Sequence, residues 1–259
     1  MSYLNTSPLV WGMLHGRQRG AFDLAFRLPS ECAERLADGR AELGLVPVME
    51  MARQGMDALP GVGIACRGAV RSILLISRVP FERIRTLAAD TGSRTSVELA
   101  RIVLERRYGA RPEVRREAPE VEKMLRGNDA ALVIGDPALR IDPAKIPHAT
   151  LDLGREWWEM TGLPMVFAVW AGPGPLDAGR FRAENFLDSY RFGAERLDEI
   201  VAAEHERRGV PAALAARYLR DNIVYELGTR EYAGLERFLE YAQAMPESSL
   251  STAAETATS

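Results

Sequence analysis

The sequence has few of the residues on which metal, disulfide and nucleophile chemistry depend. Its 259 residues include only two cysteines and three histidines. Cys32 and Cys66 are too few for a disulfide framework or a four-ligand zinc site, and the histidines do not have metal-ligand spacing. Both cysteines are interpreted as small core residues. We therefore expect no metal, no cofactor and no cysteine–histidine mechanism.

Several signatures are also missing. The sequence has no glycine-rich dinucleotide loop, no Walker loop and no Gly-x-Ser-x-Gly elbow. No window approaches the roughly eighteen apolar residues of a membrane helix, and the chain does not open on a signal peptide. A net charge of −3 argues against a basic nucleic-acid-binding face. We expect a cytoplasmic protein, monomer or homodimer, without a nucleic-acid or membrane partner.

Short apolar runs alternate with helical patterns through the first two thirds of the chain. This alternation predicts an α/β fold with a largely parallel sheet. Strands are expected at Leu43–Val46, Val62–Cys66, Ser72–Ile76, Arg85–Ala89, near Val114, and at Ala130–Ile134, Leu151–Leu153 and Met165–Trp170. Helices are expected at Leu9–Leu14, from an N-cap at Ser30 to Gly39, at Thr95–Tyr108 and Val121–Arg126, around Trp157, and over most of Phe181–Gln243.

The order of these patterns predicts two lobes. We expect the first lobe to comprise residues 1–89 and 171–245, the second lobe residues 90–170, and a disordered tail at 246–259. A chain that crosses twice between lobes leaves a cleft, and such clefts bind ligands.

The run Tyr3-Leu4-Asn5-Thr6 is the first candidate for that cleft. Asn5 can donate and accept hydrogen bonds, and Thr6 adds a hydroxyl near the start of a helix, where free N–H groups favour an anion. The alternative is an ordinary cap and turn, which residues of these types form in most proteins.

A second candidate precedes the Thr95–Tyr108 helix. Ser93, Thr95 and Ser96 supply hydroxyls at a helix N-terminus, which can cradle a carboxylate or a phosphate. Arg94 could add a charge-assisted hydrogen bond. The alternative is a well-capped helix with a solvated arginine.

Two further segments could carry chemistry. Ser72 places a hydroxyl at the start of a buried strand, although a satisfied core serine is the simpler interpretation. Gly135 and Asp136 follow a strong strand at its carboxyl end, where open α/β sheets place their sites. Asp136 is either an acid or base, or the cap of the next turn. Trp157 is interpreted as core or hinge packing.

Taken in order, these segments resemble the chorismate dehydratases of the futalosine route to menaquinone. The resemblance rests on Ser2–Leu9, Leu28–Ala33, Leu43–Glu50, Val70–Ile73, Ser93–Ser96, Gly135–Ala138, Trp157 with Thr161–Pro164, and Tyr218–Phe238. It implies a type-II periplasmic-binding-protein-like fold in a cytoplasmic enzyme that removes water from chorismate to give 3-[(1-carboxyvinyl)oxy]benzoate. Family members usually have a first strand before the Tyr-Leu-Asn run, and here we expect that strand to be nearly missing.

The resemblance also implies roles for residues. Asn5 and Ser72 would be the polar groups nearest the reacting ring, and Ser93, Thr95 and Ser96 would hold a carboxylate. Our hypothesis is that a substrate carboxylate takes the proton, with Asp136 as the alternative base. The competing functions are a later futalosine-pathway enzyme of the same fold, dihydroxynaphthoate synthase, and a non-catalytic small-carboxylate-binding protein.

Overall fold

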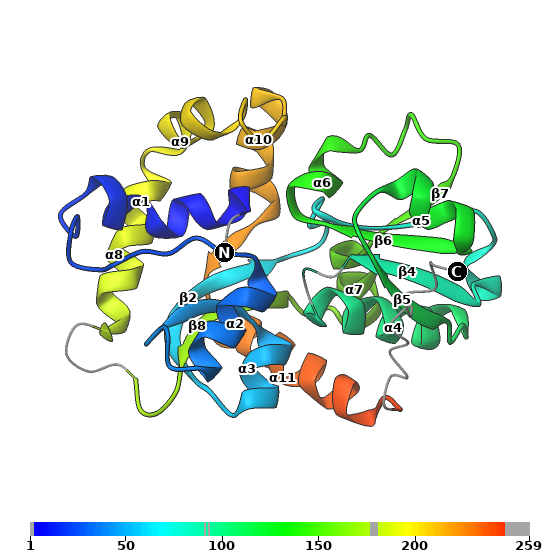
Figure 1. Cartoon of the computed structure of the whole chain (residues 1–259), viewed down its shortest axis with the longest axis horizontal. Coiled ribbons are helices and arrows are strands. Elements are labelled where there is room, and N and C mark those ends of the chain that lie inside the picture. Colours follow the sequence, from blue (N-terminus) through cyan, green and yellow to red (C-terminus); the bar gives the residue numbers. More distant parts are fainter. Residues whose placement is uncertain (1–2, 91, 93, 177–180, 247–259) are drawn as a thin grey trace, which may run out of the picture.

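The computed structural model describes residues 3–90, 92, 94–176 and 181–246 and places their strands in two sheets (Figure 1). A four-stranded sheet has the order β1-β8-β2-β9, and a five-stranded sheet has the order β5-β4-β6-β3-β7. The strands are β1 (Gly44–Pro47), β2 (Asp57–Cys66), β3 (Ile73–Ser77), β4 (Thr86–Asp90), β5 (Glu113–Glu117), β6 (Ala130–Ile134), β7 (Ala149–Asp152), β8 (Met165–Gly172) and β9 (Val224–Glu226).

Helices pack around both sheets, with α1, α8 and α9 on the side of the first sheet and α4 to α7 around the second (Figure 1). Helix α11 contacts β8 and α3 on one side and α4 on the other, so it joins the lobes. The helices are η1 (Leu4–Thr6), α1 (Ser7–His15), α2 (Pro29–Ala37), α3 (Val48–Gln54), η2 (Phe81–Arg83), α4 (Arg94–Tyr108), α5 (Val121–Gly127), α6 (Gly135–Arg140), α7 (Leu153–Thr161), α8 (Ala183–Ala194), α9 (Leu197–Glu204), α10 (Ala212–Arg217), η4 (Tyr218–Asn222) and α11 (Thr229–Ala244).

The α/β class is confirmed, but the expected parallel pairing holds for only part of one sheet. Strand β4 runs parallel to β5 and β6, whereas β3 is antiparallel to both β6 and β7. Every pairing in the four-stranded sheet is antiparallel. The reason is that β8 and β9 return to this sheet after the chain has passed through the other lobe, and such a return does not require a βαβ crossover.

Sheet membership also divides the chain at points other than those expected. The strands β3 and β4 lie before the expected border at residue 89, yet both belong to the five-stranded sheet. Strand β8, expected in the second lobe, pairs with β1 and β2. We therefore propose that the chain leaves the first lobe near Arg71 and returns to it near Pro164.

Most elements lie within a few residues of their expected positions, and β6 has the expected bounds. Helix α2 begins at Pro29, and its N-cap is Leu28, two residues before the expected cap at Ser30; the Leu28 N–H donates to Glu31 Oε2 at 3.3 Å. The short strand β9 interrupts a region that we expected to be almost wholly helical, and the helix before it, η4, is a π-helix. The expected tail lies, from residue 247, outside the described residues.

The segment 22–28 belongs to no helix or sheet among the described residues. Its apolar residues alternate as in a strand. Phe22 and Leu24 pack against the core, whereas Phe26 and Leu28 are 42% and 45% exposed. A groove of about 400 Å³ lies between this segment and β1, lined also by Thr6. Strand β1 is thus an edge strand of the four-stranded sheet, and the groove lies beside it.

Trp157 packs at the return between the lobes. It is fully buried, and its indole Nε1 donates to the Pro164 carbonyl at 3.2 Å. The rings of Phe238 and Tyr241 on α11 meet it edge-on, each with a centroid distance of 5.9 Å. The interpretation of Trp157 as a packing residue is confirmed.

Candidate active site

A narrow cleft lies where the two lobes meet. The first lobe contributes η1 and parts of β1, β2 and β8, and the second contributes the starts of β3 and α4 and the end of β6. Its polar lining consists of Tyr3, Asn5, Ser72 and Ser96. The free volume is about 40 Å³, room for roughly three waters and far below the ~300 Å³ of small-molecule pockets. The lobes are therefore closed in this structure, and they must separate to admit a ligand.

Asn5 and Ser72 meet at a third polar side chain. The hydroxyl of Tyr218, the first residue of the π-helix η4, donates to Ser72 Oγ at 2.9 Å. The Asn5 side chain also hydrogen-bonds this hydroxyl. Burial raises the pKa of Tyr218 well above its ordinary value, so the phenol stays protonated at neutral pH. Three segments far apart in the sequence thus form one polar cluster at the cleft.

A strained turn sets the position of Ser72. Arg71 has a φ of 66°, in the left-handed region that residues other than glycine rarely occupy. The Asp152 carboxylate accepts from the Val70 N–H at 2.9 Å and from the Arg71 N–H at 2.6 Å. The Arg71 guanidinium donates to three backbone carbonyls of α6 and the residue after it, among them Ala138 at 3.0 Å. Surrounding bonds of this kind maintain a strained backbone, and strain of this kind clusters at functional sites.

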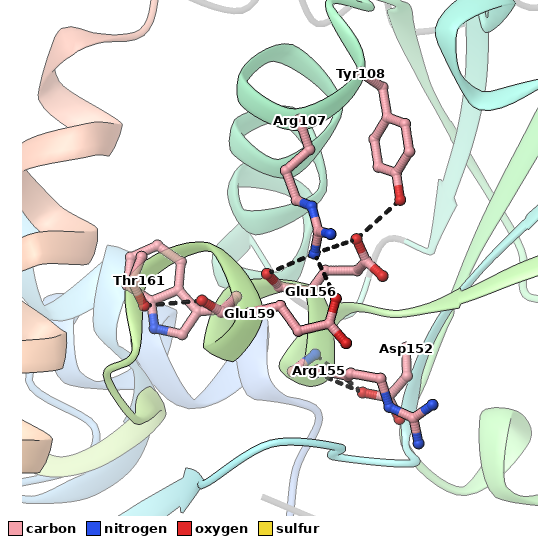
Figure 2. Close-up of polar contacts among 9 residues, drawn as sticks. Arg107, Tyr108, Asp152, Arg155, Glu156, Glu159 and Thr161 are labelled. Carbon is pink, nitrogen blue, oxygen red and sulfur yellow. Dashed lines mark hydrogen bonds and ion pairs between the residues drawn. The ribbon is translucent and has the colours of Figure 1, made fainter.

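Asp152, which holds this turn, also contacts helix α7, and Figure 2 shows the second of these contacts. Its Oδ1 accepts from the Arg155 N–H at 3.1 Å and so caps the helix. One turn further, Glu156 accepts from the Tyr108 hydroxyl at 2.9 Å and pairs with Arg107 at 2.8 Å. Burial, and then the Glu156 carboxylate, raise the pKa of Tyr108 to about 12. These contacts fix α7 against α4 behind the turn that carries Ser72.

Both carboxylate oxygens of Asp136 have a partner. Oδ1 accepts from the Leu4 N–H at 2.9 Å, and Oδ2 pairs with Arg208 at 2.5 Å. Arg208 pairs in turn with Glu204 at 2.7 Å, and all three side chains are nearly buried. Leu4 precedes Asn5 in η1, so Asp136 in the second lobe holds the short helix that carries Asn5. These two bonds give Asp136 a structural role and leave it little freedom to act as a base.

Tyr3 occupies the space beside two glycines of the second lobe. A Cβ on Gly135 would lie 2.6 Å from the Tyr3 ring, and a Cβ on Gly92 would lie 2.8 Å from its hydroxyl. Gly135 also has a φ of 65°, which favours glycine. Burial, followed by the charges of Asp90 and Asp136, raises the pKa of Tyr3. The absence of side chains at both glycines lets an aromatic ring from the first lobe reach into the second.

The start of helix α4 contributes less to the cleft than expected. Ser96 lines it, whereas the Thr95 hydroxyl accepts from the Met49 N–H of the first lobe at 3.2 Å. Arg94 pairs across the lobes with buried Glu50 at 2.5 Å and lines a separate polar crevice of about 90 Å³. Ser93 lies outside the described residues.

The structure thus brings four of the expected site residues together at the cleft: Asn5, Ser72, Ser96 and Gly135. Thr6 lines the groove in the first lobe, and Thr95, Arg94 and Asp136 make interlobe contacts. The polar residue that we did not predict is Tyr218, because an isolated tyrosine in a helical stretch gives no signal of its own.

Within the described ranges, no three His, Cys, Asp or Glu side chains form a group that could hold a metal ion. No helix in the part of the chain that the structure describes is long and apolar enough to cross a membrane.

Solved structures show the same fold. A protein from Archaeoglobus fulgidus matches with a TM-score of 0.69 at 18% identity, covering 93% of this chain and 94% of that one. The periplasmic aliphatic sulphonate binding protein of Escherichia coli matches with a TM-score of 0.63 at 13% identity, covering 99% and 92%. A Candida albicans protein described as having the generic periplasmic binding protein fold matches with a TM-score of 0.64 at 13% identity, covering 95% and 89%. The periplasmic-binding-protein-like fold is confirmed.

Relatives in sequence identify the family, which the fold alone does not. The chorismate dehydratase of Thermus thermophilus is 30% identical over 255 residues, 92% of each chain. The chorismate dehydratase of Campylobacter jejuni is 23% identical over 219 residues, 84% of this chain and 82% of that one. A family model described as menaquinone biosynthesis matches residues 1–244. The chain therefore belongs to the menaquinone biosynthesis family, as the ordered segments predict.

Proposed function

We propose that this chain is a chorismate dehydratase, a carbon–oxygen lyase that removes water from chorismate to give 3-[(1-carboxyvinyl)oxy]benzoate. Two relatives that align over most of the chain carry this activity in their names. The observation that carries the proposal is the cleft itself, where Asn5, Ser72 and Tyr218 form a neutral polar cluster between apolar walls. The family resemblance also supports a cytoplasmic location.

The reaction needs a site that orients its substrate. Loss of a ring proton and of the ring hydroxyl makes the cyclohexadiene aromatic, so the products are strongly favoured and the barrier lies in removing the proton. The described lining of the cleft has no carboxylate, imidazole or amine. Asp136, the alternative base, is engaged by the Leu4 N–H and by Arg208.

A substrate carboxylate is therefore the base in our proposal. It takes the ring proton, the C–O bond breaks, and the proton and the departing hydroxyl leave together as water. Asn5 and Ser72 hold the groups that react, and the closed lobes exclude competing water. Ser96, at the start of α4, lies where the N–H groups of a fifteen-residue helix favour a substrate carboxylate.

Charge outside the cleft favours an anionic substrate as well. Arg53, Arg94 and Arg116 line the polar crevice, and Glu50 pairs with the first two. Three guanidinium groups against that carboxylate leave a local positive excess, although the crevice also holds Glu34. Chorismate, with two carboxylates, fits this pattern.

Mixing purified protein with chorismate and following the loss of water by mass tests the proposal. We expect conversion to the product without added metal or cofactor. Binding of chorismate without conversion would instead favour a non-catalytic binding protein, a carrier or a sensor. Conversion of a futalosine-derived substrate, with chorismate left intact, would favour the later enzyme of the same fold.

A further inference from the structure

Tyr218 organises the polar groups of the cleft from behind. It does not line the cleft, and it is fully buried. Its single hydroxyl proton is donated to Ser72 Oγ. The bond with Asn5 must therefore run from the Asn5 amide N–H to the phenol oxygen, because a phenol has one proton to give.

The directions of these two hydrogen bonds determine which donors and acceptors remain available to a ligand. Ser72 Oγ accepts from Tyr218, so its own proton is available for another acceptor. Asn5 uses an amide N–H toward Tyr218, and its buried Oδ1 has no hydrogen-bond partner among the described residues. The pair therefore presents the Ser72 hydroxyl as a donor and Asn5 Oδ1 as an acceptor, besides the second N–H of the Asn5 amide. A hydroxyl group, which accepts one hydrogen bond and donates another, satisfies both.

We infer that Tyr218 is a positioning residue that fixes the direction of these hydrogen bonds, so that Ser72 donates to, and Asn5 Oδ1 accepts from, the ring hydroxyl that leaves. The inference rests on the proposed function, and it adds the residue that selects the hydroxyl. The π-helix supplies the placement: η4 begins at Tyr218, and π-helical turns concentrate at functional sites.

Tyr218 is not the source of the proton for the departing water. Giving up its proton would leave a buried phenolate, and burial raises the pKa of this group. The proton comes from the ring carbon through the substrate carboxylate, and Tyr218 keeps its own. The network therefore predicts a loss of rate without a change in pH dependence when the hydroxyl is removed.

Tyr218→Phe tests the inference, with Tyr225→Phe as the matched control. Tyr225 is also buried, but its hydroxyl has no partner among the described residues. We expect Tyr218→Phe to lower kcat for chorismate roughly tenfold or more, with an unchanged shape of the pH profile. The Kd of the product, which lacks the ring hydroxyl, should stay within about twofold in both variants, and Tyr225→Phe should keep kcat.

The outcomes separate this inference from the proposed function. If the wild type and Tyr218→Phe convert chorismate equally fast, the inference is overturned and the proposed function stands. An equal weakening of chorismate and product binding also overturns it, because that pattern indicates a general structural defect. If the wild type converts no chorismate, the proposed function is wrong. The inference about Tyr218 is then wrong as well, unless Tyr218→Phe weakens the binding of chorismate and leaves the binding of the product unchanged.

Discussion

Replacing Gly135 by Ala should displace Tyr3 from the interlobe contact. The new Cβ would lie 2.6 Å from two ring carbons of Tyr3, at a residue whose φ is 65°. The left-handed backbone costs an alanine roughly 1–2 kcal/mol, and overpacking adds roughly 1–3 kcal/mol. We expect a total loss of about 2–5 kcal/mol in the free energy of unfolding, together with a higher KM for chorismate because Tyr3 lines the cleft.

Gly162→Ala is the matched control. Gly162 has a φ of 67°, and a Cβ there would meet no atom within 4 Å. Its loss should be the backbone cost alone, roughly 1–2 kcal/mol, with KM unchanged. Urea unfolding and chorismate kinetics on both variants measure the difference. Equal losses of stability and equal KM values would refute the idea that Tyr3 is held against Gly135.

Three further substitutions test the framework of the site. Asp136→Asn should keep chorismate turnover within about threefold. Its free energy of unfolding in urea should fall by roughly 2 kcal/mol, because the partner of Arg208 loses its charge. Lost turnover at full stability would instead support Asp136 as the base. Asp152→Ala should lower the free energy of unfolding by roughly 3 kcal/mol in the same assay and should also lower kcat, because the turn at Arg71 and the N-terminus of α7 both lose their acceptor. An unchanged kcat would argue against the idea that this turn positions Ser72. Burial raises the pKa of Asp90, so the folded state binds this proton more tightly than the unfolded state does. Its contribution to stability is therefore complete below about pH 4 and is lost as the pH rises through the raised folded pKa, a slope that Asp90→Asn should remove across a pH series of urea midpoints.

Local patterns predicted the elements well, because they depend on residues close in the chain. The run Ala130–Ile134 is apolar throughout and forms a fully buried strand with the expected bounds. The helix that ends at Tyr108 begins one residue before its expected start. The pairing direction of the strands was harder to predict, because it depends on where the chain re-enters each sheet.

Candidate site residues could be predicted from the sequence where they belong to a motif, but not where only tertiary contacts bring them to the cleft. The ordered segments predicted Asn5 and Ser72 as site residues, and in the structure both contact the Tyr218 hydroxyl. Tyr218 is brought there by a π-helical turn that no periodicity indicated. The partner of Asp136 was equally hidden, because Arg208 is separated from it by 72 residues and belongs to the other lobe.

The central claim is that hydroxyl and amide groups in the interlobe cleft dehydrate chorismate without a protein base. Initial rates of water loss from chorismate, measured by mass for the wild type, Asn5→Ala, Ser72→Ala and Asp136→Asn, test it most directly. The account predicts conversion by the wild type and by Asp136→Asn, with losses of roughly a hundredfold or more in the two alanine variants. Activity in both alanine variants with none in Asp136→Asn would contradict it.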